Sequence, residues 1–198
     1  ESLKLLESAE KIEPDRAEIY SSAAMVFARM GKAKESEIRI NKAGDLGQDK
    51  PNLYFMAGYM LIAADNKEDG VKFLANSIKL GLNDPYKLMK VADTLQRLRQ
   101  SWLSAYAYLE AGTNFIFSGT ERERKFALSP FGKLHRTFLS WGDSKSAHIC
   151  LILKSQSESE SFREKEGYPT LSTEEIYQSI EEIHKSLEEA KKGFMKEK

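Results

Sequence analysis

The sequence predicts an all-helical fold in which pairs of helices stack into an α-α superhelix, closed by a long C-terminal capping helix. Three observations predict it. A pattern of large and small residues returns every 34 residues, glycines and prolines mark helix ends at that same interval, and the segment 172–198 carries one apolar stripe at helical spacing. The composition agrees, because 41% hydrophobic and 30% charged residues are ordinary for a folded protein.

The first segment, residues 1–16, is typical of half a repeat. A helix is predicted over residues 2–13, with Leu6 and Ala9 at places that later repeats fill with a large and a small residue, and Pro14 closes it. A second helix without its partner predicts that the array begins upstream of Glu1. Because the chain does not begin with methionine, we expect a truncated N-terminus.

Three full repeats follow, at residues 17–50, 51–84 and 85–118. Tyr20, Tyr54 and Leu88 open them at equal intervals. Small residues at two fixed places should let paired helices approach closely, and large residues around them should fill the space to the next repeat. The matching sets are Ala24, Gly58 and Ala92; Phe27, Leu61 and Leu95; Ser36, Gly70 and Ser104; Ile40, Leu74 and Tyr108; Ala43, Ser77 and Ala111. The predicted helix pairs are 17–30 and 33–46, 51–64 and 67–80, and 85–98 and 101–117.

Helix-end signals share the interval. Gly47 and Gly81 stand where a left-handed residue can end a helix, and Pro51 and Pro85 suit the first turn of the next one. Gly31 lies in the turn inside the first full repeat. The remaining alternative is a non-repeating helical bundle that matches the period by chance.

Residues 1–118 resemble the tetratricopeptide repeat family, whose 34-residue unit is a pair of helices joined by a short turn. The resemblance implies a TPR-like solenoid whose concave side is built from the first helix of each pair. The family prefers proline near the thirty-second place of the repeat, and only Pro14 meets that preference.

Residues 119–161 are predicted to hold an insertion and a degenerate fourth repeat. If about nine residues are inserted, the repeat places are filled by Phe131, Phe138, Gly142, Ala147 and Leu151. His135 and Lys154 depart from the small residues expected at two places. The polar segment 155–161 is interpreted as a helix end running into a solvated loop, with phosphorylation as the alternative.

Residues 162–198 are predicted to form a linker and an amphipathic helix. Ser172 and Glu175 have capping-box spacing. The apolar stripe contains Ile176, Ile180, Ile183, Leu187, Ala190 and Phe194. A helix of this kind should bury the last repeat of a solenoid and expose a polar face. A coiled-coil seam between two copies is the alternative.

Motifs for chemistry are missing from the sequence. It contains no glycine-rich phosphate loop, nucleophile elbow or paired-cysteine motif. Cys150 is the single cysteine, and His148 two residues before it should point to another face. We therefore expect no enzyme activity, no cofactor and no metal site. Thirty basic residues balance thirty acidic ones, and no apolar run approaches about 20 residues, so neither nucleic acid binding nor membrane insertion is expected. Cytoplasm and periplasm both fit.

The resemblance implies a partner-binding groove on the first helices. Its predicted residues are Met25, Arg29, Asn52, Phe55, Met56, Tyr59, Ile62, Tyr86, Met89, Lys90, Asp93 and Arg97. One subgroup of the family grips a terminal carboxylate with polar residues. Here Ser21, Met25 and Met56 stand at three of those places and only Lys90 fits, so that use is not expected.

The middle of the predicted groove is apolar, and its methionines suit an adaptable surface. The sequence therefore predicts a non-catalytic interaction module, an adaptor or scaffold that binds a helix or an extended apolar segment of a partner protein. Burial of these side chains as core is one alternative. Others are a structural assembly subunit that self-associates, as a homodimer, through the C-terminal helix, and an accessory domain of a larger enzyme.

Overall fold

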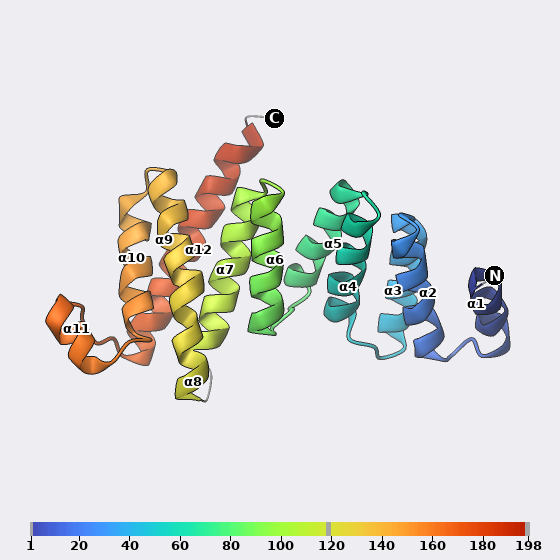
Figure 1. Ribbon diagram of the computed structural model, residues 1–198, viewed down its shortest axis with the longest axis horizontal. Coiled ribbons are helices and arrows are strands. Elements are labelled where there is room, and N and C mark those ends of the chain that lie inside the picture. Colours follow the sequence, from blue (N-terminus) through green and yellow to red (C-terminus); the bar gives the residue numbers. More distant parts are fainter. Residues whose placement is uncertain (1, 118–119, 197–198) are drawn as a thin grey trace. The chain divides into compact units, whose positions relative to one another are not determined.

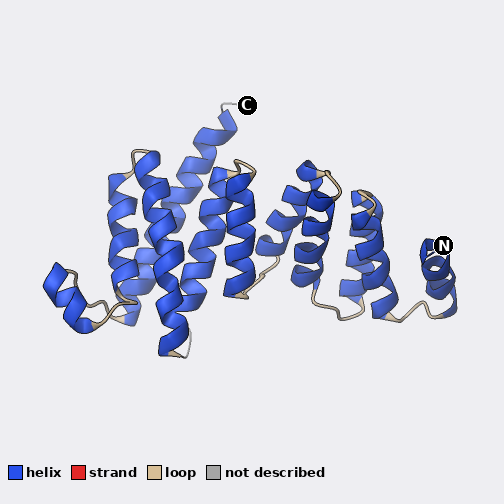
Figure 2. Cartoon of the chain, in the orientation of Figure 1, coloured by secondary structure: helices blue, strands red, loops and turns tan. Residues whose placement is uncertain are grey.

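A computed structural model describes residues 2–117 and 120–196; the side chains at 2, 3, 7 and 194–196 are also outside the described part. All regular elements in these residues are helices, joined by short turns and loops, and no strand occurs among them (Figure 2). The predicted all-α class is confirmed.

The chain forms two compact units, residues 1–82 and residues 83–198. The first contains α1 (Ser2–Ile12), α2 (Ala17–Arg29), α3 (Ala33–Asp45), α4 (Lys50–Ala63) and α5 (Lys67–Lys79), drawn blue to blue-green in Figure 1. The second contains α6 (Pro85–Arg97), α7 (Ser101–Ile116), α8 (Glu121–Arg124), the 3-10 helix η1 (Lys125–Ala127), α9 (Leu128–Ser140), α10 (Ser144–Ser155), α11 (Glu160–Glu166) and α12 (Thr173–Lys196). The six helices predicted for the full repeats are confirmed within one residue at each end.

Helices α2 and α3, α4 and α5, α6 and α7, and α9 and α10 pack in pairs as helical hairpins. Each hairpin turns through one residue with positive φ: Gly31 (73°), Asp65 (62°), Arg99 (58°) and Gly142 (78°). The first three are 34 residues apart. The 34-residue interval seen in the sequence therefore corresponds to a backbone conformation that recurs in successive turns. Asp65 and Arg99 adopt it where the first turn has glycine.

Within each hairpin one pair of residues joins the two helices, and we call it the hairpin contact. The pairs are Ala24 with Ser36, Gly58 with Gly70, Ala92 with Ser104, and His135 with Ala147. Ser36 Oγ donates to the carbonyl of Ala24 and Ser104 Oγ to that of Ala92, both at 2.9 Å. Each bond joins a serine of the second helix to a carbonyl group of the first helix that lies twelve residues earlier in the sequence.

The glycine pair brings α4 and α5 closer together. A Cβ built on Gly70 would lie 2.9 Å from the carbonyl oxygen of Gly58 and 2.5 Å from Cγ1 of Ile62. Such distances leave no room for a side chain. The small residues predicted at these places thus have two uses: serine adds a hydrogen bond, and glycine allows a tighter approach.

His135 accounts for the departure noted in the fourth repeat. Its Nδ1 donates to the carbonyl of Ala147 at 2.9 Å, so the first helix supplies the side chain and the second the carbonyl, the reverse of the serine hairpins. In α10, Leu151 is only partly buried, whereas Cys150 and Leu153 are fully buried. The place that the fourth-repeat register assigns to Leu151 is therefore not among the fully buried places of α10.

The core of residues 1–82 explains the first two repeats. It contains the buried residues Ala24, Ala28, Ile40, Ala43, Leu53, Tyr54, Ala57, Leu61 and Phe73. The rings of Tyr54 and Phe73 meet edge to face with centroids 5.2 Å apart. Asp49 caps α4 by accepting from the amide of Asn52 at 3.2 Å.

The C-terminal helix α12 packs along the second helices α7 and α10 (Figure 1). Its stripe residues Ile180, Ile183 and Leu187 are buried, and Trp102 Nε1 of α7 donates to the carbonyl of Leu187 at 2.7 Å. The side chain of Phe194, predicted for the same stripe, is outside the described part. The helix α12 covers α10 of the last hairpin, as expected of a capping helix, and also covers α7, so its apolar stripe is used within the chain.

The capping box at the start of α12 is confirmed. The amide of Ser172 donates to Glu175 Oε2 at 2.7 Å, and the amide of Glu175 donates to Ser172 Oγ at 3.3 Å. The amide of Ser172 and its hydroxyl, which donates to the same oxygen at 2.8 Å, together lower the pKa of Glu175.

Candidate functional site

The predicted groove residues lie on the first helices of three hairpins, divided between the two units. Helices α2 and α4 carry those from Met25 to Ile62 within residues 1–82, and α6 carries those from Tyr86 to Arg97 within residues 83–198. We describe the two groups separately.

On α4, Asn52, Phe55, Met56 and Tyr59 form a group that we call the α4 surface. The rings of Phe55 and Tyr59 meet edge to face with centroids 5.1 Å apart, and Nδ2 of Asn52 lies 4.0 Å from the sulfur of Met56. Met56 is 39% exposed, while Phe55 and Tyr59 are half-buried. Two rings and a thioether thus form an apolar surface that remains partly open to solvent.

Three neighbouring predictions have mixed outcomes. Met25 packs against the buried core of its unit, and Ile62 contacts α5 at Gly70, so both side chains serve partly as packing. Arg29 is exposed at the end of α2. The alternative that the predicted groove side chains are buried as core therefore applies to Met25 and Ile62 more than to the α4 surface.

On α6, Tyr86 belongs to an aromatic cluster that the sequence did not reveal. Its ring centroid lies 5.1 Å from that of Phe115 in α7 and 5.7 Å from that of Phe126 in η1. Phe126 comes from the insertion, to which the repeat register assigns no place. The insertion forms two short helices and brings this aromatic ring to a predicted groove residue.

Asp93 is held inside its own unit. The hydroxyl of Tyr108 in α7 donates to Asp93 Oδ1, and Nζ of Lys133 in α9 contacts the same oxygen. Burial alone would raise the pKa of Asp93, but the hydrogen bonds from Lys133 and Tyr108 and the nearby positive charges outweigh it, so the pKa is lowered. Burial and the negative charge of Asp93 raise the pKa of Tyr108.

The same contacts reveal basic residues on α9. Lys133 and Arg136 lie one turn apart, and with Gln96, Thr137 and Ser140 they line a pocket of about 190 Å³ between α6 and α9. Lys90 and Arg97 are exposed on the face of α6 that carries Asp93, and Met89 is half-buried beside them. Lys133 and Arg136 were not predicted, because the groove was taken from the three full repeats only. The register assigned to the fourth repeat would have placed both on the same face.

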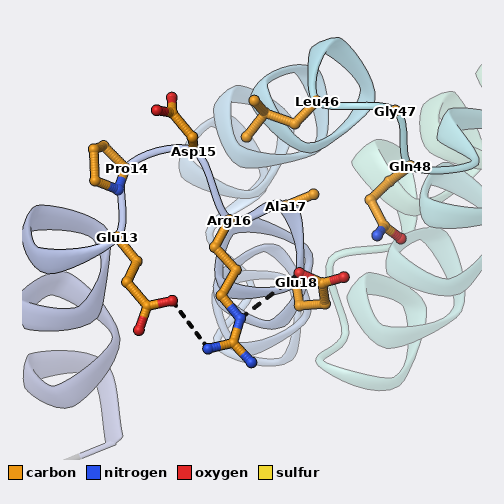
Figure 3. A pocket seen from close by; sticks show the side chains of 9 residues that line it. All are labelled: Glu13, Pro14, Asp15, Arg16, Ala17, Glu18, Leu46, Gly47 and Gln48. Atoms are coloured by element: carbon orange, nitrogen blue, oxygen red, sulfur yellow. Dashed lines mark hydrogen bonds and ion pairs between the residues drawn. The ribbon is translucent and has the colours of Figure 1, made fainter.

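Other pockets mix charges of both signs. One of about 540 Å³ in residues 1–82 lies beside the α1–α2 loop, where Arg16 pairs with Glu13 at 3.0 Å and with Glu18 at 3.9 Å (Figure 3). Another of about 450 Å³ in residues 83–198 is lined by Glu121, Arg124, Lys125, Gln156, Ser157, Glu158 and Ser159. Neither presents a group of one sign that would select a ligand.

The described residues contain no metal-binding cluster and one buried cysteine. No group of three or more histidine, cysteine, aspartate or glutamate side chains in residues 2–117 and 120–196 could hold a metal ion. Cys150 is buried, and burial raises the pKa of its thiol. In the same residues, no helix combines the length and the apolar character needed to cross a bilayer.

Comparison with family models, curated proteins and solved structures finds no match to this chain. The resemblance to the tetratricopeptide family, and the superhelix that it implies, remain predictions.

Proposed function

We propose that the chain is a non-catalytic adaptor that binds a partner polypeptide on the exposed side of its first helices, with the α4 surface as its apolar contact. The observation that supports the proposal most is a half-buried pair of aromatic rings beside an exposed thioether, on a helix whose opposite side is buried core. Leu53, Tyr54, Ala57 and Leu61 of α4 face inward, so the fold does not need Met56 at the surface.

The chemistry of the α4 surface suits an amphipathic helix or an extended apolar segment. Aromatic rings supply a large contact area at low cost in side-chain entropy, and a flexible methionine adjusts to different partners. Truncating an aromatic anchor in a protein interface typically costs about 2 kcal/mol or more, about thirtyfold in affinity. We therefore expect Phe55 and Tyr59 to contribute most of the apolar binding energy.

The helical hairpins and the tetratricopeptide-like register support the same proposal, since this family uses its first helices to hold polypeptides. Self-association through α12 receives less support, because Ile180, Ile183 and Leu187 are already buried against the chain's own helices. A TPR-like adaptor is thus the function that the described residues favour.

Affinity capture tests the proposal. The wild-type chain is immobilised, its ligand is identified by mass spectrometry, and the corresponding purified segment is titrated against the double variant Phe55→Ala, Tyr59→Ala. We expect its affinity to fall by about a hundredfold while helical circular dichroism is unchanged. The matched control is Ile38→Ala, which removes a 63% exposed apolar side chain from the second helix α3. Equal binding by the double variant and the wild type would contradict the proposal.

A further inference from the structure

The first helices of residues 83–198 carry a concentration of positive charge that the whole chain does not share. Lys90 and Arg97 project from one face of α6, and Lys133 and Arg136 from the facing stripe of α9. We call these four residues, together with Asp93, the α6/α9 surface. The full chain has zero formal net charge, so this excess is a local feature.

Part of this charge is not neutralised within the chain. Asp93 balances Lys133, and Arg97 donates to the hydroxyl of Thr94 at 3.1 Å. For Lys90 and Arg136 no carboxylate lies within 4 Å in the described part of the chain. Three positive charges therefore remain in excess on a surface formed by two helices.

The pocket between α6 and α9 offers donors to an incoming anion. The hydroxyl of Tyr108 gives its single hydrogen to Asp93 and lies 3.0 Å from the side-chain amide of Gln96, so the amide nitrogen of Gln96, when turned toward that hydroxyl, donates one hydrogen to it and keeps the other for a ligand. The hydroxyls of Thr137 and Ser140 donate to the carbonyls of Lys133 and Thr137, so neither hydrogen is available. Arg136, Lys133 and Gln96 are consequently the groups that can bind a carboxylate, and Arg136 can do so with two parallel hydrogen bonds.

We propose that the α6/α9 surface binds an acidic segment of the partner polypeptide, with one side-chain carboxylate of that segment in the pocket beside Arg136. This inference rests on the proposed adaptor function and assigns a second, electrostatic contact to it. The pocket of about 190 Å³ suits a single carboxylate and its stem better than a whole molecule.

A peptide fits this surface better than a nucleic acid. Asp93 stands among the basic residues and would repel a regular row of phosphates, whereas carboxylates at irregular spacing can avoid it. Tyr86 and Phe126 are 51% and 44% exposed, and Tyr86 lies one turn before Lys90 on α6. They offer apolar contact to the uncharged residues that an acidic segment also contains.

The test uses the full chain and a short glutamate-rich peptide labelled with fluorescein, followed by fluorescence anisotropy. We expect saturable binding that weakens as salt is added. Arg136→Glu should weaken it about tenfold, and Lys90→Glu combined with it about a hundredfold. The control Arg122→Glu, a charge reversal at an exposed site on α8, should change the affinity by less than about twofold. A peptide with glutamine in place of glutamate should not bind.

Several outcomes would overturn the inference. They are absence of saturable binding, an equal loss in Arg136→Glu and Arg122→Glu, displacement of the peptide by inorganic phosphate as readily as by unlabelled peptide, and tighter binding of a single-stranded oligonucleotide. Light scattering can give a further contradicting outcome. If the wild-type chain forms an oligomer and Arg136→Glu dissociates it, the ligand of this surface is a second copy of the chain. The variant Phe55→Ala, Tyr59→Ala should keep its affinity for the acidic peptide, so each proposal can fail without the other.

Discussion

The two units build their hairpins alike but expose different chemistry on their first helices. In residues 1–82, α4 presents two half-buried aromatic rings and an exposed thioether, whereas in residues 83–198 the face shared by α6 and α9 is mostly basic. Their hairpin contacts differ as well, since α4 and α5 meet through Gly58 and Gly70, while α6 and α7 use a hydrogen bond from Ser104. The buried positions thus preserve one scaffold, and the exposed positions of the same helices are free to carry different ligand preferences.

The largest effect on stability is expected when each unit receives the residue that the other has at its hairpin contact, in the variants Gly70→Ser and Ser104→Gly. In Gly70→Ser, the new Cβ would lie 2.9 Å from the carbonyl oxygen of Gly58, so the helices must separate; we expect a loss of about 2–3 kcal/mol. Ser104→Gly removes a buried hydrogen bond and adds a helical glycine, which should cost about 1.5–2 kcal/mol. Urea denaturation measures both, and hydrogen exchange assigns each loss to its unit.

Gly132→Ala is the control for these exchanges. Gly132 is also a helical glycine, but a Cβ there would meet only Cδ of Lys154, at 3.9 Å. Alanine should therefore raise stability by about 0.5–1 kcal/mol through helix propensity. If Gly70→Ser proved as stable as the wild type, the inference that α4 and α5 approach more closely than α6 and α7 would be wrong. The hairpins of the two units would then have the same separation between their helices.

A smaller effect is expected where the charged surface also supports the fold. Asp93→Asn weakens the contacts with Lys133 and Tyr108 and should cost roughly 1 kcal/mol, reduced by partial exposure of the carboxylate. Because the folded pKa of Asp93 lies below its unfolded value of 3.8, its contribution is present above pH 3.8 and is lost as the pH falls through the folded pKa. The variant should therefore show a shallower loss of stability in acid.

The same variant separates folding from binding. Removing the only negative charge of the α6/α9 surface should tighten its affinity for the acidic peptide by about three- to tenfold, although the fold is less stable. Anisotropy at neutral pH measures the affinity, and thermal denaturation between pH 2 and 7 measures the acid dependence. A parallel loss of affinity and stability would show that Asp93 holds the basic residues in place instead of opposing the ligand.

Helix positions were predictable from the sequence because the hairpin period depends on local signals. Size alternation, helix-ending glycines and capping residues each act within one or two turns, so they locate α2 to α7. The packing of α12 was not predictable in the same way. An amphipathic stripe fixes which residues are buried, but not which neighbour covers them, and α7 and α10 become its partners only through the tertiary fold.

The candidate site was predictable in part. Phe55, Met56 and Tyr59 were predicted because the tetratricopeptide resemblance implies groove places on the first helix and the repeat register assigns these residues to them. Phe126 was not predicted, since it comes from an insertion without a repeat place, and Arg136 was missed because the groove was taken from the three full repeats only. His135 illustrates the reason: a hydrogen bond to Ala147 satisfies the hairpin contact without the small residue that the pattern requires.

The smallest expected effect tests whether the repeated turn conformation is common to both units. Asp65 in the first unit and Arg99 in the second hold φ values of 62° and 58°, a conformation that costs an ordinary L-residue roughly 1 kcal/mol, whereas Gly31 and Gly142 adopt it freely. Asp65→Gly and Arg99→Gly should each raise stability in urea by up to about 1 kcal/mol, less the entropy that glycine adds to the unfolded chain. Asp65→Ala and Arg99→Ala serve as controls and should bring no gain, because alanine keeps the strain. Gains of similar size in both units would indicate one turn geometry throughout, while a gain in one unit alone would confine the shared scaffold to that unit.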